Sequence, residues 1–208
     1  MSLATNGSTI GVLAIQGDFA AHARALERVG VRAVEVRRAV DLENIDGLII
    51  PGGESTTMLM LIAEDDLGRS ITAFAREGKP VFGTCAGTIL LAQEVHNPRQ
   101  DSLGLIDIDV ERNAYGRQVD SFIAEAETTI EGGPLEAVFI RAPKIRRVGA
   151  SIDVLARIEC EPVFVRQGNV LAATFHPELT EDQRVHCLFA EMVARSSYQQ
   201  HNPVVSRA

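Results

Sequence analysis

Apolar and polar positions over residues 1–90 predict strands that alternate with helices. Asp18 precedes the helical pattern of residues 19–29 as its expected N-cap, and Gly30 is expected to end that helix. Ser55 is the expected N-cap of a second helix. Alternation of this kind predicts parallel strands with helices on both faces of the sheet. The apolar runs typical of buried strands lie within segments 9–18, 31–37, 47–66 and 67–83.

The rest of the chain has mostly strand patterns, followed by one helix. Phe122, Ala124 and Ala126 fall on one side of a strand pattern, and the sequence RQGN is typical of a hairpin turn. Thr180 and Gln183 have the spacing of a capping box before an apolar helical stripe. The strand patterns lie within 103–112, 119–130, 136–143, 150–159 and 161–178.

These patterns predict an α/β fold, a three-layer sandwich around a central mixed, mostly parallel sheet. One domain is expected over residues 10–195, and residues 1–9 and 196–208 are expected to be flexible termini. The 208 residues, 46% of them hydrophobic, suffice for a single core. No apolar run approaches the roughly 18 residues of a membrane span, and the start lacks the pattern of a signal peptide.

Charge and cysteine content narrow the function classes. The net charge of −8 disfavours a surface for nucleic acid or anionic membranes. Three cysteines without close pairing disfavour a disulfide framework and favour the reducing cytoplasm. The histidines are scattered, so no metal site is expected. His22 and His186 lie within expected helices, where a solvated role is favoured, while His96 and His201 are expected in loops.

Cys85 lies between Gly83 and Gly87, where an expected strand meets an expected helix. This is the pattern of a nucleophile elbow, in which small flanking residues allow a tight turn and expose the reactive atom. The N-terminus of the following helix would favour a thiolate. The alternative is a small buried cysteine at a strand end. The two glycines and the strand–turn–helix context favour the elbow.

His176 and Glu178 stand two residues apart in the sequence ATFHPELT. If this segment is extended, both side chains leave the same face. The carboxylate could then fix the imidazole tautomer and stabilise the imidazolium that forms when His176 accepts the thiol proton. A surface turn with a helix-capping acid is the alternative. The elbow at Cys85 favours the catalytic interpretation.

Residues 51–56, PGGEST, place two glycines at the end of an expected strand. Main-chain N–H groups can converge there on a small anionic centre such as a tetrahedral oxyanion. A phosphate-binding nest is a weaker alternative because no lysine follows in the P-loop pattern. A structural turn is the third possibility.

Six segments taken together resemble the class I, or triad, glutamine amidotransferases. The likeness covers about residues 10–195 and is closest to the glutaminase subunits of pyridoxal 5′-phosphate synthases. GTCAG or HPE alone would indicate only the superfamily, whereas PGGEST with RNAYGRQ and FIRAP favours these subunits. The resemblance implies a flavodoxin-like fold. The segments are VLAIQGD, PGGEST, GTCAGTILLA, ERNAYGRQVDSF, FIRAP and TFHPELTEDQRVHCLF.

The resemblance implies hydrolysis of L-glutamine to L-glutamate and ammonia without cofactor or metal. Cys85 would attack the side-chain carboxamide to form a glutamyl thioester, His176 would move the proton, and Glu178 would hold His176. An oxyanion hole formed by Gly53 and Ala86 is also implied. An arginine suits the substrate α-carboxylate because it can bind bidentately, and Arg112, Arg117 and Arg141 all remain candidates. The implied substrate-binding residues are Gly52, Gly53, Glu54, Ser55, Arg112, Ile140 and Arg141.

The resemblance also implies a hetero-oligomer with a separate synthase subunit, in the cytoplasm that the cysteine content favours. Ammonia released into water would be protonated and diffuse away, which favours direct transfer in a docked complex. A subunit that serves another biosynthetic synthase and a non-catalytic regulatory subunit on the same fold are alternatives. A flavodoxin-like cysteine protein without a histidine–glutamate pair is disfavoured by HPE. An α/β-hydrolase is disfavoured by the order Cys85, His176, Glu178.

Overall fold

The computed structural model describes residues 7–112, 114 and 121–201. The helices are α1 (Phe19–Arg28), α2 (Ser55–Glu64), α3 (Leu67–Arg76), α4 (Ala86–Leu91), α5 (Arg184–His201) and the 3-10 helices η1 (Ala39–Asn44) and η2 (Pro177–Leu179). The strands are β1 (Thr9–Leu13), β2 (Arg32–Val36), β3 (Gly47–Ile50), β4 (Val81–Thr84), β5 (Ala92–His96), β6 (Ile106–Glu111), β7 (Ser121–Thr128), β8 (Leu135–Ile140), β9 (Lys144–Val148), β10 (Asp153–Ile158), β11 (Glu161–Gln167) and β12 (Val170–Ala173).

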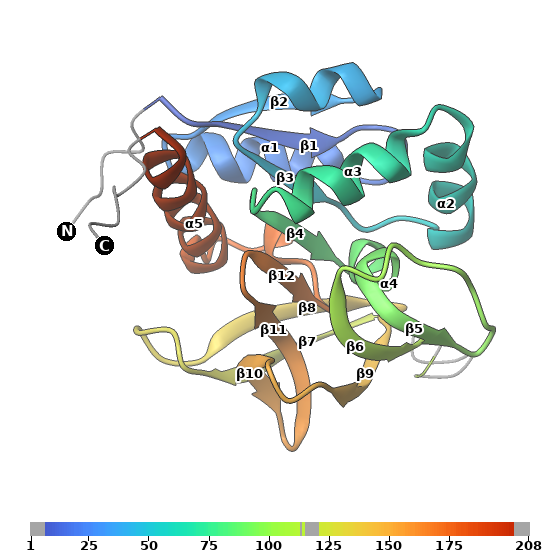
Figure 1. Ribbon diagram of the computed structural model, residues 1–208. Helices are drawn as coiled ribbons and strands as arrows, with labels where there is room; N and C mark the ends of the chain where they lie inside the picture. The colour runs from blue at the N-terminus through green and yellow to red at the C-terminus, as the bar shows by residue number, and fades with distance from the viewer. Residues whose placement is uncertain (1–6, 113, 115–120, 202–208) are drawn as a thin grey trace, which may run out of the picture.

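A nine-stranded mixed sheet with the order β2-β1-β3-β4-β12-β11-β10-β7-β8 forms the centre of the fold (Figure 1). The pairings from β2 to β12 are parallel, as the alternation of strands and helices predicts. The pairings from β12 to β8 are antiparallel, so the parallel part of the sheet is smaller than expected. The hairpin turn between β11 and β12 is present, with Gly168 at positive φ.

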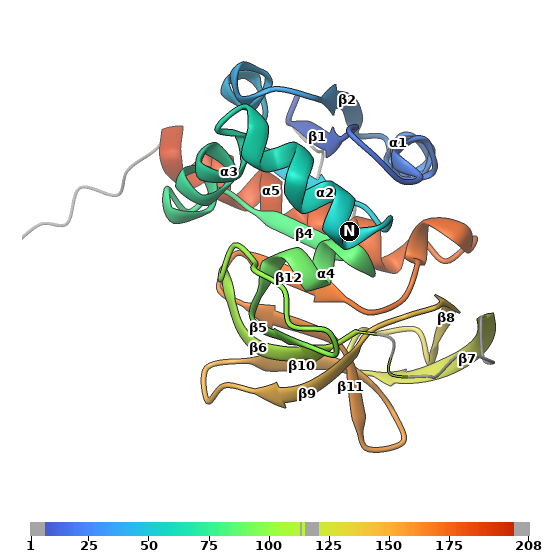
Figure 2. The same ribbon diagram turned by 90° about the vertical axis from the view of Figure 1, so that its right-hand side faces the viewer.

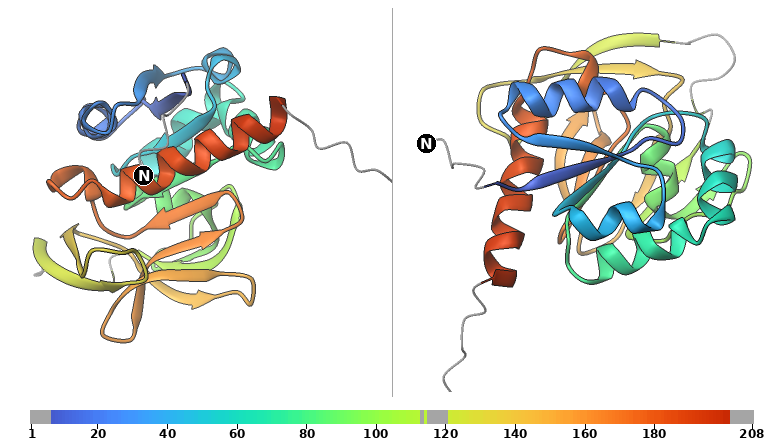
Figure 3. Two further views of the ribbon diagram at one scale, coloured as in Figure 1. Left: turned by 90° about the vertical axis from the view of Figure 1, so that its left-hand side faces the viewer. Right: turned by 90° about the horizontal axis from the view of Figure 1, so that it is seen from above.

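Helices cover both faces of the parallel strands. In the view from above, α1 lies on one side of these strands and η1 and α3 lie on the other (Figure 3). Alternate residues of each strand enter two hydrophobic clusters. In β4, for example, Phe82 joins α1 and α5 in one cluster, whereas Val81 joins α2, α3 and α4 in the other. This arrangement is the predicted three-layer sandwich.

A second sheet of three strands, in the order β5-β6-β9, lies beside β11 (Figure 2). Strands β5 and β9 are absent from the sequence-based prediction. The Gln167 side chain joins the two sheets, since its Oε1 accepts a hydrogen bond from the Asp107 N–H at 2.8 Å. Helix α5 continues past residue 195, where the expected domain ends. No helix among the described residues is long and apolar enough to cross a membrane.

Two of the three expected helix caps differ in the structure. Asp18 caps α1 as expected and accepts a hydrogen bond from the Ala21 N–H at 3.1 Å. Ser55 is not the cap of α2, because Glu54 takes that place and its longer carboxylate reaches the amides of the first turn. Thr180 does not cap α5, which begins only at Arg184; its hydroxyl instead accepts from the Asp182 N–H.

Candidate active site

Cys85 connects β4 to α4 in a strained backbone conformation with φ 48° and ψ −104°. Such a conformation costs on the order of 1–3 kcal/mol and persists only where the surroundings enforce it. A Cβ added at Gly83 would lie 2.6 Å from the Gly87 carbonyl carbon, and one added at Gly87 would lie 2.0 Å from the Ile50 oxygen. Both glycines are therefore required for the close approach of helix and strands that forms the elbow.

His176 follows β12, the parallel neighbour of β4. Its main-chain N–H donates to the Val138 oxygen of β8 at 2.8 Å, and its Nδ1 lies 2.7 Å from Glu178 Oε1. The sequence allowed an extended segment here. The structure instead has a turn, because Pro177 begins the 3-10 helix η2. This turn nevertheless brings the imidazole and the carboxylate together. The Glu178 side chain is 1% exposed and that of His176 is 12% exposed.

The charges and hydrogen bonds around His176 favour a protonated imidazole. Burial opposes protonation of His176, but hydrogen bonds with Cys85 and Glu178 outweigh it and raise the pKa of His176 to about 10. Burial likewise opposes ionisation of Glu178, yet the neighbouring His22 and His176 overcome that penalty, so the pKa of Glu178 lies below its ordinary value. The three side chains of Cys85, His176 and Glu178 thus form one interacting unit, in which an imidazolium can stabilise a thiolate.

A pocket of about 360 Å³ opens over Cys85. Gly52 forms part of its wall, and a Cβ at this position would lie 2.4 Å from His176 Cε1 and 3.3 Å from Cys85 Cβ. Gly53 lies beside Gln16, whose Oε1 accepts a hydrogen bond from the Glu54 N–H at 2.7 Å. The predicted residues Gly52, Gly53, Glu54, Ser55, Cys85, Ala86, Arg112, Ile140, Arg141, His176 and Glu178 all line this pocket.

The polar wall of the pocket centres on Glu54. Hydrogen bonds from Thr57 and from the Thr56 N–H outweigh partial burial and lower the pKa of Glu54 to about 2. Arg112 Nη2 lies 3.4 Å from Glu54 Oε1 and donates to Thr56 Oγ1 at 3.1 Å. Ser55 is buried and donates to Gln100 Oε1 at 3.0 Å. Sequence reasoning missed the contribution of Gln100, which lies in a loop without a distinctive motif.

Residues at the end of β8 form the opposite wall. The Ile140 oxygen lies 3.9 Å from Cys85 Sγ and can accept a hydrogen bond from the thiol. Arg141 follows with a positive φ of 44° and is exposed at the pocket. Arg112 and Arg141 therefore both line the pocket. Arg117, the third candidate, lies outside the described residues.

The expectation that His22 and His186 are solvated is wrong. His22 is 0% exposed and His186 is 1% exposed, and His22 Nδ1 lies 3.1 Å from His186 Nε2. His22 Nε2 lies 3.3 Å from Glu178 Oε2, so the two histidines extend inward from the active site. The pattern of α1 carries a signal for this burial, because His22 is on the same helix face as Ala21 and Ala25, which are also buried.

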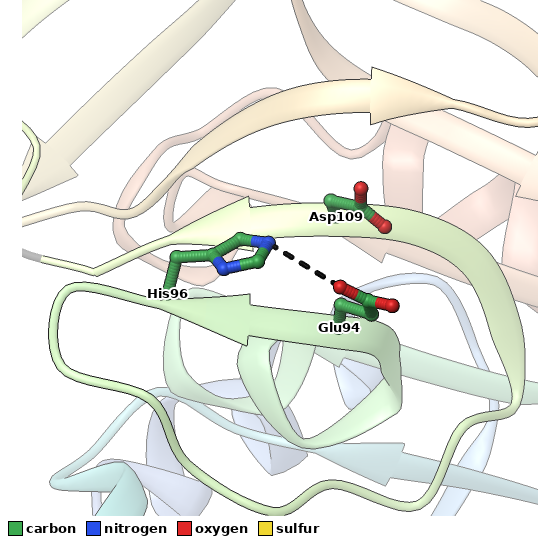
Figure 4. A group of neighbouring side chains, drawn as sticks. All are labelled: Glu94, His96 and Asp109. Carbon is green, nitrogen blue, oxygen red and sulfur yellow. Dashed lines mark ion pairs between the residues drawn. The ribbon is translucent and has the colours of Figure 1, made fainter.

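A group of metal-ligand residue types lies on the small sheet (Figure 4). Glu94, His96 and Asp109 have ligand atoms within 4.8 Å of one another. Both oxygens of Asp109 already accept hydrogen bonds from Arg147, at 2.8 and 2.7 Å, and Glu94 lies 3.7 Å from His96. We interpret this group as an exposed ion-pair cluster.

Comparisons with known proteins agree with this geometry. The family model described as the SNO glutamine amidotransferase family matches residues 12–195. Pyridoxal 5′-phosphate synthase subunit PdxT of Solibacter usitatus is 57% identical over 186 residues, which cover 86% of this chain and 96% of that protein. PdxT of Thermotoga petrophila is 51% identical over 185 residues, covering 88% and 98%.

A crystal structure described as that of a glutamine amidotransferase has a TM-score of 0.84 against this structure, at 50% sequence identity. The match covers 88% of this chain and 98% of the other. The motifs, the fold and the family match thus lead to one assignment. The chain belongs to the SNO glutamine amidotransferase family.

Proposed function

We propose that this protein hydrolyses L-glutamine to L-glutamate and ammonia, as the glutaminase subunit of a pyridoxal 5′-phosphate synthase. The observation that carries the proposal is the unit formed by Cys85, His176 and Glu178 at the floor of a pocket. The names and high identity of the PdxT relatives support the same reaction and the same assembly.

The first half-reaction transfers the glutamyl group to sulfur. The Cys85 sulfur attacks the carboxamide carbon while its proton resides on His176, and the carbonyl oxygen becomes an oxyanion. The main-chain N–H groups of Gly53 and Ala86, which border the pocket, are the proposed donors to that oxyanion; such a donor contributes roughly 3–4 kcal/mol to the barrier. The carbon–nitrogen bond then breaks, His176 returns its proton to the leaving nitrogen, and ammonia and a thioester result.

The second half-reaction releases glutamate. His176 accepts a proton from water, whose oxygen attacks the thioester carbon at the same oxyanion site. The carbon–sulfur bond breaks and leaves the Cys85 thiolate beside the protonated His176, so the resting pair is restored. The carboxyl group of the product gives its remaining proton to solvent, and glutamate leaves. Glu178 accepts the Nδ1–H of His176 throughout, which keeps Nε2 available for proton transfer and stabilises each imidazolium that forms.

The pocket has the charges that an α-amino acid requires. Glu54 remains ionised at physiological pH and can attract the α-ammonium group. Arg112 and Arg141, at opposite walls, can hold the α-carboxylate. Ser55, Gly52 and the carbonyl of Ile140 complete the polar surround. The proposed pocket therefore holds glutamine by the two charged groups on its α-carbon and presents the side-chain carboxamide to Cys85.

The proposed partner is the synthase subunit that consumes the ammonia. Ammonia becomes ammonium in water, and ammonium is not nucleophilic, so transfer without release into solvent requires a docked complex. We place the complex in the cytoplasm, because Cys85 must remain reduced and all three cysteines are free thiols.

The decisive experiment measures glutamate and ammonia release from glutamine by the purified chain, alone and with a pyridoxal 5′-phosphate synthase subunit. Hydrolysis should rise when that subunit is added and should be absent from the Cys85→Ala variant. Synthases from other pathways serve as controls for the choice of partner. Equal turnover with every synthase, or full turnover by Cys85→Ala, would contradict the proposal.

A further inference from the structure

A line of buried polar side chains runs from the triad carboxylate into the core. Glu178 Oε2 lies 3.3 Å from His22 Nε2, which is also 3.1 Å from Thr84 Oγ1. His22 Nδ1 in turn lies 3.1 Å from His186 Nε2. All four residues are buried, and Phe82 packs edge-on against the His22 ring. Polar groups are costly to bury in such a cluster unless they satisfy one another.

The second oxygen of Glu178 needs a donor. Oε1 is engaged by His176, whereas Oε2 has less than 1 Å² of exposed surface and no hydrogen-bond partner among the described residues. An ionised carboxylate oxygen in the interior is strongly destabilised unless an N–H or O–H group points at it. The ring edge of His22, at 3.3 Å, can supply that N–H through a small rotation toward Oε2.

The charge states of the line determine its tautomers. Burial lowers the pKa of His22, although the carboxylates of Glu178 and Asp18 act in the opposite sense. Burial is also the largest cause that lowers the pKa of His186, to about 3. Both rings are therefore neutral and each carries one N–H. A bare nitrogen lone pair facing Glu178 Oε2 would be repelled. The proton of His22 must then lie on Nε2, and His22 Nδ1 must accept from the Nε2–H of His186.

We propose that His22 is a positioning residue of the glutaminase, which donates its Nε2–H to Glu178 and is held in that tautomer by His186. The effect on the chemistry is indirect. A carboxylate fixed at both oxygens cannot rotate away from His176, and it remains ionised to stabilise the imidazolium. The role rests on the proposed function of the triad, but the ionisation of Cys85 can test it without glutamine.

The test compares His22→Leu with His22→Gln in the full chain. Leucine removes the donor, while the glutamine carboxamide nitrogen can reach the place of Nε2 and restore it. His186→Leu removes only the group that fixes the His22 tautomer. Phe164→Leu is the matched control, because Phe164 is buried in the same hydrophobic cluster and packs on Phe82 but is apolar.

Two readouts are measured across pH. The first is the rate of glutamine hydrolysis with the synthase subunit present. The second is the rate at which iodoacetamide alkylates Cys85, quantified by mass spectrometry of its peptide because Cys160 and Cys187 are also free. The groups that face His22 and shape these profiles are Glu178, His176 and His186, with Asp18 at the start of its own helix.

His22→Leu should lower kcat about tenfold. It should also move the acid limb of both pH profiles to higher pH by about one unit. Both effects have the size expected when a hydrogen bond to a charged group is lost. His22→Gln should restore most of both, and His186→Leu should give a smaller shift in the same direction. Phe164→Leu should lose thermal stability without moving the acid limb.

An unmoved acid limb in His22→Leu, or the same shift in Phe164→Leu, would reduce His22 to a structural role and overturn the inference. Failure of His22→Gln to restore the profile would also overturn it. If even the wild-type chain released no glutamate, the proposed function would fail, while the alkylation profiles would still decide the role of His22.

Discussion

A single methyl group at Gly52 should disable the enzyme without unfolding it. The Cβ of Gly52→Ala would lie 2.4 Å from His176 Cε1, whereas ordinary carbon contacts begin at about 3.4 Å, so the imidazole must retreat by about 1 Å. The ring cannot move freely, because Nδ1 is bound to Glu178 at 2.7 Å and the main-chain N–H is bound to Val138. A displacement of about 1 Å in a catalytic group costs on the order of 100-fold in rate.

The structural cost of the same substitution should be modest. Overpacking of one methyl group costs about 1–3 kcal/mol, which a domain of this size tolerates. Gly68→Ala is the matched control, because the nearest atom to its added Cβ is 3.5 Å away and it lies in α3, where alanine is favoured over glycine by up to about 1 kcal/mol.

The assay follows glutamate release with the synthase subunit present, alongside thermal unfolding of each variant. Gly52→Ala should lose about 100-fold in kcat and retain a cooperative transition, while Gly68→Ala should keep its activity and unfold at the same or a higher temperature. Near-normal turnover by Gly52→Ala would show that His176 does not act from the position described.

Three further predictions concern the same pocket. His176→Asn should retain no more than a few per cent of the rate, measured as glutamate release; greater retention would exclude His176 as the base. Because the pKa of His176 is raised from 6.5 to about 10, its stabilisation of the fold should be complete below about pH 6.5 and should disappear as the pH rises through 10. The gap in melting temperature between wild type and His176→Asn should narrow over that interval, and a constant gap would refute the pairing. Arg141→Ala should raise KM for glutamine at least tenfold with a smaller change in kcat. An unchanged KM would show that Arg141 does not bind the α-carboxylate, so that Arg112 would be the remaining candidate at the pocket.

Sequence patterns predicted the strands of the parallel half of the sheet, but they missed two strands in the rest of the fold. The alternating apolar runs and helices before Cys85 correspond to β1 to β4 with their intervening helices. Strand β9, KIRRV, was missed because Arg146 and Arg147 point outward and form ion pairs with Glu111, Asp107 and Asp109. Strand β5 was missed because its apolar start continues the run that ends α4.

Within the site, short sequence motifs identified residues that line the pocket, but they did not identify the buried residues behind them. Cys85, His176 and the glycines stand in local patterns whose chemistry can be read from spacing. The partnership of His22 with Glu178 depends on how α1 docks against η2, and no spacing along the chain encodes it. A histidine on the apolar face of a helix is the one local clue, since the pattern predicts burial without naming a partner.

The two halves of the sheet contribute different parts of the site. Strands β4 and β12 are parallel neighbours with Thr84 opposite Ala173, so the chain leaves both at the same edge, and Cys85 and His176 meet although about ninety residues separate them. The antiparallel strands lie between Cys85 and His176 in the sequence, and one of them, β8, returns to this edge of the sheet. There the Val138 oxygen binds the His176 N–H and the Ile140 oxygen faces the Cys85 sulfur. The parallel half of the sheet therefore positions Cys85 and His176, and the antiparallel half forms the opposite wall of the pocket and holds the main chain of His176.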